Sequence, residues 1–150
     1  MLTLQRVTAG EDLAAVRLLF SEYVRAVDAP ECFVGFEREL AALPGGYAAL
    51  FLAKKDGAAA ACAAMRRLDP ATAEMKRLYV RPQHRGHRLG RLLTEEVIRA
   101  ARGEGCERLL LDTLPQMENA LELYLALGFR EIGAYLPEPT PGARCFELRL

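Results

Sequence analysis

The chain contains, at residues 81–93, the basic segment Arg81-Pro82-Gln83-His84-Arg85-Gly86-His87-Arg88-Leu89-Gly90-Arg91-Leu92-Leu93, in which two glycines precede leucines at helical spacing. The preceding residues 74–80 (EMKRLYV) predict a strand. A strand, a glycine turn and a helix in this order direct backbone N–H groups towards a bound anion. Residues 75–94 include six Lys or Arg and no Asp or Glu. We therefore predict a phosphate cradle; a solvated basic surface around a tight turn is the alternative.

A second segment makes the interpretation of the first segment more specific. It is Asn119-Ala120-Leu121-Glu122-Leu123-Tyr124-Leu125-Ala126-Leu127-Gly128-Phe129. Together the two segments resemble the Gcn5-related N-acetyltransferase (GNAT) superfamily. Its first motif is a Gln/Arg-x-x-Gly-x-Gly/Ala turn, and its second is an Asn-bearing helix that ends in Tyr-x-x-x-Gly-Phe. The resemblance spans residues 74–132, and it implies acetyl transfer from acetyl-CoA to an amine.

The turn departs from the superfamily pattern at one position. In Gln83-x-x-Gly86-x-Arg88, an arginine stands where Gly or Ala is usual, and Gly90 follows two residues later. A residue other than glycine is readily accommodated where φ is negative, as it is at the start of a helix. We therefore expect Arg88 to be an early helical residue whose guanidinium faces solvent or a phosphate.

Hydrophobic spacing along the rest of the chain predicts a single α/β domain over residues 1–150. Strands are expected at residues 2–7, 47–54, 58–68, 74–80, 108–113, 129–135 and 145–150. Helices are expected from a Thr8-x-x-Glu11 capping box to the residues before Pro30, and at 33–43, 88–103 and 117–127. The order β-α-α-β-β-β-α-β-α-β-β predicts a GNAT-like mixed sheet with helices on both faces.

Composition excludes several classes of protein. The 20 basic and 20 acidic side chains give a net charge of zero, so no global field attracts nucleic acid or an acidic membrane. The four cysteines lie far apart without a Cys-x-x-Cys pair, so we expect neither a metal site nor a disulfide framework. No Gly-Lys-Ser/Thr follows the glycines, and their spacing is not that of a dinucleotide-binding turn.

The chain shows no secretion signal and no apolar run that approaches the ~20 residues of a membrane span. Its longest apolar run extends from residue 58 to residue 65. We therefore expect a cytoplasmic protein that does not interact with membranes.

The resemblance assigns the acetyl-CoA contacts to two groups of residues. Backbone groups of Leu78, Tyr79 and Val80 are expected to pair with the pantetheine amides, because the strand splays from its neighbour in this superfamily. The cradle for the pyrophosphate is then expected to consist of Arg85, Gly86, His87, Arg88, Leu89, Gly90 and Arg91. Asn119 is expected to hold the coenzyme arm. Surface solvation of the arginines and local helix capping by Asn119 are the structural alternatives.

Two side chains are candidates for catalysis. Tyr124, on the second motif's helix, can protonate the departing thiolate, because phenol and thiol acidities are close at about 10 and about 8.5. Glu74 lies where histone-modifying members have a general-base glutamate, and period-two alternation places it on one face with Lys76, Leu78 and Val80. A core aromatic and a solvated glutamate paired with Lys76 or Arg67 are the alternatives. None of the cysteines has an evident histidine partner, so direct attack by the amine is expected.

The sequence predicts an N-acetyltransferase for a small-molecule or peptide amine, and it does not choose the acceptor. Glu37, Tyr135, Glu138 and Arg144 are possible acceptor contacts. A non-catalytic acyl-CoA sensor is the alternative function. Nucleic-acid binding by residues 76–91 is disfavoured by the zero net charge and the few aromatic residues. A homodimer is possible.

Overall fold

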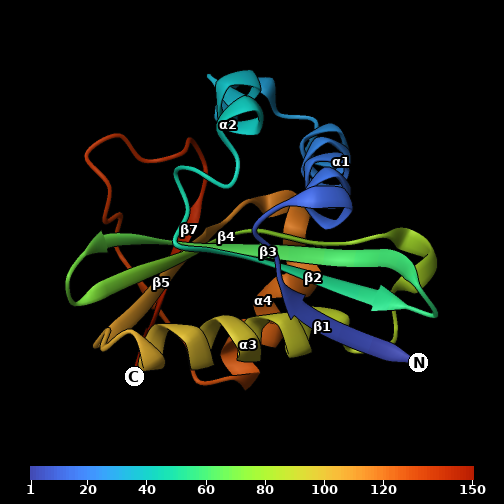
Figure 1. The fold of residues 1–150 in the computed structure, drawn as a ribbon. Helices are drawn as coiled ribbons and strands as arrows, with labels where there is room; N and C mark the ends of the chain where they lie inside the picture. Colours follow the sequence, from blue (N-terminus) through green and yellow to red (C-terminus); the bar gives the residue numbers. More distant parts are fainter.

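The computed structural model describes residues 1–150, apart from the side chains of Gln116, Glu118 and Asn119. Figure 1 shows the ribbon. The α-helices are α1 (Gly10–Val27), α2 (Phe36–Ala42), α3 (Leu89–Gly103) and α4 (Glu118–Ala126). The strands are β1 (Leu2–Arg6), β2 (Ala49–Lys55), β3 (Ala58–Asp69), β4 (Thr72–Val80), β5 (Arg108–Thr113), β6 (Arg130–Ile132) and β7 (Arg144–Arg149). Short 3-10 turns occupy Pro30–Cys32, Pro82–His84 and Pro115–Met117.

All seven strands form one sheet in the order β1-β2-β3-β4-β5-β7-β6. The pair β4–β5 is parallel and the other pairs are antiparallel. Helices α1 and α2 cover one face of the sheet, and α3 and α4 cover the other (Figure 1). The predicted α/β fold class and the order of its elements are therefore confirmed.

Each face of the sheet has its own apolar core. On the side of α3 and α4, the core contains Met75, Leu93 and Val97, and on the side of α1 it contains Val16 and Phe20. Between them lies β3, whose alanines at positions 60, 61, 63 and 64 are completely buried. Alanine favours helix in isolation, but here its small side chain fits a central strand that is covered by helices on both faces.

A bulge in β4 corrects the predicted alternation of that strand. Cys62 pairs with Tyr79 and Ala64 pairs with Lys76, so two residues of β4 face one residue of β3. Arg77, inside the bulge, has φ 60°. An extra residue reverses the side-chain alternation beyond it. Leu78 and Val80 therefore pack against the core that contains Met75. Glu74 lies on the opposite face from Leu78 and Val80, and the expectation of one shared face was wrong.

Several predicted boundaries are corrected at the ends of helices. The Thr8-x-x-Glu11 capping box does not form: Ala9 is the N-cap of α1, and its side chain has no oxygen that could accept a hydrogen bond. The helix expected at 33–43 begins only at Phe36, after Gly35 with φ 82°. The strand expected at 129–135 is limited to β6, and residues 133–143 form a loop. The loop lies on the same side of the sheet as α2 (Figure 1).

Candidate active site

The strands β4 and β5 separate in the middle of the sheet. They pair from Thr72↔Arg108 to Glu74↔Leu110, and β4 then runs on to Val80 without continuing the ladder to β5. Helix α4 and the turn before it lie beside the opening. Among the described residues, the edge of β4 that faces β5 has no strand partner after Glu74, so it can accept an extended ligand as an added strand. The Val80 carbonyl accepts a hydrogen bond from Arg85 Nε at 3.3 Å.

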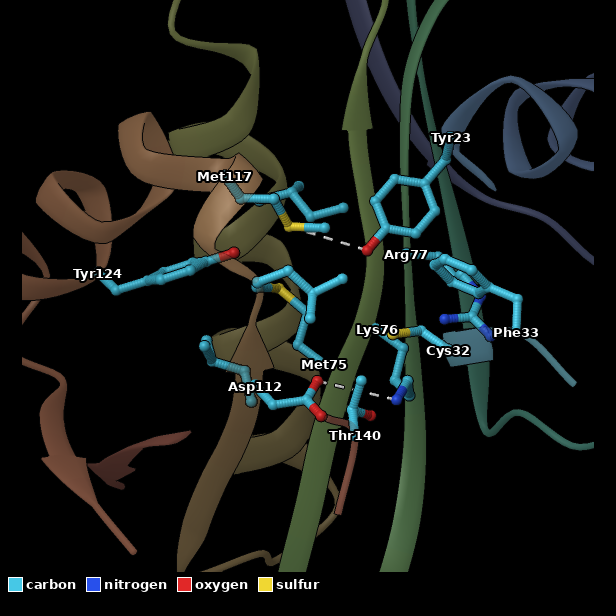
Figure 2. Close-up of a pocket in the computed structure, with 13 residues that line it drawn as sticks. Tyr23, Cys32, Phe33, Met75, Lys76, Arg77, Asp112, Met117, Tyr124 and Thr140 are labelled. Atoms are coloured by element: carbon cyan, nitrogen blue, oxygen red, sulfur yellow. Dashed lines mark hydrogen bonds and ion pairs between the residues drawn. The ribbon is translucent and has the colours of Figure 1, made fainter. Parts of the chain in front are cut away.

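A cavity of about 70 Å³ lies at this split. It connects the two faces of the sheet, since its wall comes from β4 and β5, from α1 and the turn after it, from α4 and from the 133–143 loop (Figure 2). The lining residues that matter for chemistry are Tyr23, Cys32, Lys76, Arg77, Asp112 and Tyr124. Apolar side chains such as Phe33, Leu114 and Met117 complete the wall.

A larger groove of about 570 Å³ continues from the cavity on the side of α4. The two share Tyr23, Leu78, Met117 and Tyr124. A third hollow of about 660 Å³ surrounds the glycine turn and shares Val80, Arg85, Gly90 and Leu123 with the groove. A continuous path therefore leads from the glycine turn, along the free edge of β4, to Tyr124.

The glycine turn has a different backbone from the one the sequence predicts. Gly86 has φ 87°, and Arg88 has φ 60° and ψ 22°, so Arg88 lies in the left-handed region as the N-cap of α3. The expectation that Arg88 is helical with negative φ was wrong; the helix begins at Leu89. Left-handed residues alternating with ordinary ones turn successive N–H groups towards one concave surface, which is the geometry of an anion nest.

The structure brings together most of the predicted cradle residues. Arg85, Gly86, Arg88, Leu89, Gly90 and Arg91 all line the hollow at the turn, together with His84, which the sequence analysis did not single out. His87 points elsewhere, with its Nε2 atom 3.3 Å from Lys55 Nζ. A Cβ atom at Gly90 would lie 3.6 Å from Leu123, so α4 approaches the turn closely there. The side chain of Asn119 lies outside the described residues.

An ion pair fixes the strand end that leads into the turn. Arg81 donates hydrogen bonds to both carboxylate oxygens of Glu22 on α1, at 2.7 and 3.0 Å. It also donates to the backbone carbonyl of Ala59. Arg81 holds the pKa of Glu22 below its usual value, because the charged hydrogen bond favours the carboxylate. The turn is thus anchored to both α1 and the sheet.

Tyr124 lies on α4 and its hydroxyl group points into the cavity (Figure 2). Its ring packs against Phe129 and Phe146, and only 5% of the side chain is exposed. Burial raises the pKa of this phenol above its usual value of 10, and the charge of Asp112 adds to the effect. Among the described side chains none forms a hydrogen bond with the hydroxyl group. Tyr124 therefore presents a protonated, unengaged donor to the cavity.

Glu74 occupies a different environment from the one expected of a general base. Its side chain is completely buried, one oxygen accepts a hydrogen bond from Arg66, and the other accepts one from Tyr135 in the 133–143 loop. Glu74 does not line the cavity at the split. Its position favours neither the proposed role as base nor the alternative of a solvated strand-end glutamate.

The carboxylate that does line the cavity belongs to Asp112 on β5. Its nearest charged partner is Lys76 at 3.9 Å (Figure 2). Burial is the main cause of the raised pKa values of Cys32, Tyr23 and Tyr124. The negative charge of Asp112 also raises each of these pKa values. The sequence analysis missed Asp112. An acidic residue at the end of the buried strand 108–113 was the available signal, because strand ends beside helix termini commonly hold functional side chains.

A second group of side chains supports the far wall of the cavity. Arg77, in the β4 bulge, donates to both carboxylate oxygens of Glu39 on α2 at 2.7 and 2.9 Å. Its guanidinium lies 5.1 Å from the ring centre of Phe33 and 6.0 Å from that of Tyr23. These contacts hold α2 and the turn before it against the split. Glu37 and Glu138 are not among the cavity residues, and Arg144 forms a pair with Glu131.

The described His, Cys, Asp and Glu side chains include no group of three that could hold a metal ion. None of the helices, within the described part of the chain, is long and apolar enough to cross a membrane.

The geometry is that of an acyl-CoA-dependent transferase: a split parallel strand pair, a glycine nest at one end of the split and a buried phenol at the other. Comparison with known proteins gives the family. The family model of the acetyltransferase (GNAT) family matches residues 13–129. The chain belongs to the GNAT family, and it is an N-acetyltransferase.

Individual relatives are similar to this chain over almost its whole length. An uncharacterized N-acetyltransferase of Schizosaccharomyces pombe is 32% identical, over 99% of this chain and 95% of its own. A Klebsiella pneumoniae structure assigned as an acyl-CoA N-acyltransferase has a TM-score of 0.80 at 28% identity, covering 100% of this chain and 98% of that one. A Salmonella typhimurium structure assigned as an acetyltransferase contains acetyl-CoA and has a TM-score of 0.74 at 20% identity, covering 99% and 94%.

Proposed function

We propose that this protein transfers the acetyl group of acetyl-CoA directly to the amine of a small acceptor that binds at the split between β4 and β5. The observation that supports this most strongly is the continuous path from the glycine nest to the Tyr124 hydroxyl group. That path has three parts, which suit the pyrophosphate, the pantetheine arm and the thioester in turn.

The nest and the start of α3 would bind the pyrophosphate through backbone N–H groups. Arg85, Arg88 and Arg91 line the same hollow and would add charge to these contacts. The free edge of β4 from Leu78 to Val80 would pair with the pantetheine amides, as a neighbouring strand does. Acetyl-CoA supplies the activated acyl group; the residues described here orient it.

The acceptor would enter the cavity from the side of Tyr23 and Phe33. We assign to Asp112 the role of receiving the ammonium and of accepting, directly or through water, the proton that the nitrogen must lose before it can attack. The nitrogen then forms a bond with the acetyl carbon, and the carbon–sulfur bond breaks. Tyr124 gives its proton to the departing thiolate and regains one from the second N–H of the former ammonium. The products are an N-acetyl amide, the coenzyme A thiol and one proton released to water.

The test is coenzyme A thiol release from acetyl-CoA with a panel of amino acids, polyamines, aminoglycosides and peptides. Tyr124→Phe is measured beside the wild type, and Glu96→Gln, which neutralises a carboxylate paired with Arg99 on the outer surface of α3, is the control. Acceptor-dependent release that collapses in Tyr124→Phe but not in Glu96→Gln supports the proposal. Tight binding of acetyl-CoA without release from any acceptor would favour the sensor, and no binding of acetyl-CoA would reject the cradle.

A further inference from the structure

The cavity at the split contains two charges that lack a close partner. Lys76 and Asp112 approach each other only to 3.9 Å, beyond hydrogen-bonding distance, and among the described side chains neither has a nearer ionic contact. Arg77, which lines the same cavity, differs because Glu39 binds it through two short hydrogen bonds. One positive and one negative group therefore remain available to a ligand.

Both groups are largely removed from water. The side chains of Lys76 and Asp112 are 15% and 16% exposed. Charges in such an environment are costly unless they are paired and hydrogen-bonded. Their neighbours in the wall include Tyr23, Phe33 and Met117, which supply no compensating charge. A ligand with charges of both signs would satisfy both groups at once.

We propose that the acetyl acceptor is an α-amino acid, whose ammonium group binds Asp112 and whose carboxylate binds Lys76. This assignment rests on the proposed function, and it specifies the acceptor. The charges of an α-amino acid are attached to one carbon atom. With the ammonium against Asp112 and the carboxylate against Lys76, the four charges alternate in sign around a small ring, so every neighbouring contact is attractive.

The same geometry disfavours other amines. A polyamine places a further cation near Lys76, where the two repel each other. An aminoglycoside likewise carries several ammonium groups and no carboxylate, so it offers Lys76 no negative partner. The ω-amine of a lysine-like acceptor is joined to its carboxylate by a flexible chain, so contacting both charges at once costs it more conformational entropy than it costs an α-amino acid. Phe33, Leu114 and Met117 make part of the cavity wall apolar, which suits an apolar side chain on the acceptor.

The test uses matched acceptors. Each of the twenty common amino acids is assayed with acetyl-CoA, and each one that turns over is compared with its α-carboxamide and with its decarboxylated amine. Loss of one charge-assisted contact corresponds to roughly ten- to a hundredfold in binding. We expect kcat/KM to fall at least about tenfold for both analogues, with no change in the KM for acetyl-CoA.

Variants then locate the contact. Lys76→Met removes the charge and keeps most of the side-chain volume. We expect it to raise the KM for the amino acid about tenfold and to abolish the preference for the amino acid over its decarboxylated amine, whereas Lys76→Arg retains that preference. Arg99→Met, which removes an exposed cation of α3, is the control and leaves both values unchanged.

The outcomes separate this assignment from the proposed function. If decarboxylated amines or polyamines are acetylated as fast as amino acids, and this activity depends on Tyr124, the assignment of an amino acid as acceptor is rejected. The proposed acetyltransferase function then still stands. If none of the acceptors is acetylated, each amino acid is titrated calorimetrically into the protein saturated with coenzyme A, to measure whether it binds. Lys76-dependent binding supports the assignment, and absence of binding rejects it.

Discussion

Tyr135 donates a hydrogen bond to Glu74, a completely buried carboxylate at the last paired position of β4 and β5. The other oxygen of Glu74 accepts a hydrogen bond from Arg66. Tyr135 belongs to the loop between β6 and β7, which also contributes Thr140 to the cavity. The contact therefore ties the loop that closes the acceptor side to the point where the two strands separate.

The first prediction follows from this contact. Tyr135→Phe keeps the ring but leaves one oxygen of Glu74 buried without its donor, which costs about 1–3 kcal/mol. We expect the free energy of unfolding to fall by that amount. The KM for the acceptor should rise several-fold because Thr140 is no longer held, while the KM for acetyl-CoA stays constant. Denaturant unfolding and steady-state kinetics measure the two effects.

Glu74→Gln distinguishes positioning from base catalysis at the same place. If Glu74 acts through the loop, the variant alters the KM for the acceptor and leaves the acidic limb of the kcat profile where it is in the wild type. If it is the base, kcat falls by a hundredfold or more and that limb disappears. The second result would restore the role that the sequence pattern suggested.

The second prediction concerns Tyr124 and pH. Burial raises the pKa of its phenol above 10, so the proton that the leaving thiolate needs remains in place throughout the neutral and mildly alkaline range. We expect kcat to show no decline from loss of this proton below pH 10, and Tyr124→Phe to lower kcat about a hundredfold with little change in KM for acetyl-CoA. An alkaline decline below pH 9 that vanishes in Tyr124→Phe would contradict this.

The fold could be predicted from the sequence because its signals are local. The spacing of leucines in 89–103, the Asp56-Gly57 turn and the run of leucines in 108–113 each specify one element, and the bounds of β5 agree with the prediction to the residue. The resemblance of the two motifs to a known superfamily then fixed the topology. Boundaries failed where the N-cap residue makes no side-chain hydrogen bond, as at Ala9 and Gly35, because such a cap leaves no capping signal in the sequence.

The site was less predictable because it depends on two long-range features. The bulge at Arg77 reverses the faces of β4, and nothing in the residues 74–80 indicates it. The side chain of Arg77 contacts Glu39 and Phe33, which lie far from β4 in the sequence. Asp112 and Lys76 are 36 positions apart in the numbering. They meet only because β4 and β5 are adjacent and then separate, so spacing along the chain could not pair them.

The third prediction uses the pair Glu22–Arg81. The pKa of Glu22 is lowered in the folded protein from its usual 4.5, so the unfolded chain binds the proton more tightly. The stabilisation is therefore fully present above pH 4.5 and is lost as pH falls through the folded-state value. We expect Glu22→Gln to reduce the free energy of unfolding by about 1–2 kcal/mol at pH 7.

The deficit of Glu22→Gln relative to the wild type should shrink as the pH is lowered to 3, which urea unfolding at pH 7, 5, 4 and 3 would show. Glu96→Gln serves as the control, because Glu96 pairs with an exposed arginine on the surface of α3 and such pairs contribute little. A deficit that is the same at every pH would mean that the carboxylate charge of Glu22 does not stabilise the fold.

The last prediction compares two arginines of the cradle. Arg88 has φ 60°, a conformation that costs a residue with a side chain about 1–2 kcal/mol and costs glycine almost nothing. Arg91 is an ordinary residue within α3, where glycine costs about 1 kcal/mol. Arg88→Gly should thus leave the protein as stable as the wild type or more so, because relief of the strained backbone offsets the greater entropy of the unfolded chain, whereas Arg91→Gly should destabilise it.

Both variants remove one positive charge from the hollow around the glycine turn, so both should raise the KM for acetyl-CoA several-fold, and this increase should diminish at high salt. Thermal unfolding of the two proteins without ligand, followed by titration with coenzyme A, separates the backbone effect from the charge effect. If Arg88→Gly loses as much stability as Arg91→Gly, the left-handed N-cap at residue 88 is not the conformation that the turn adopts in solution. If only Arg88→Gly weakens coenzyme A binding, the phosphates contact Arg88 and not Arg91.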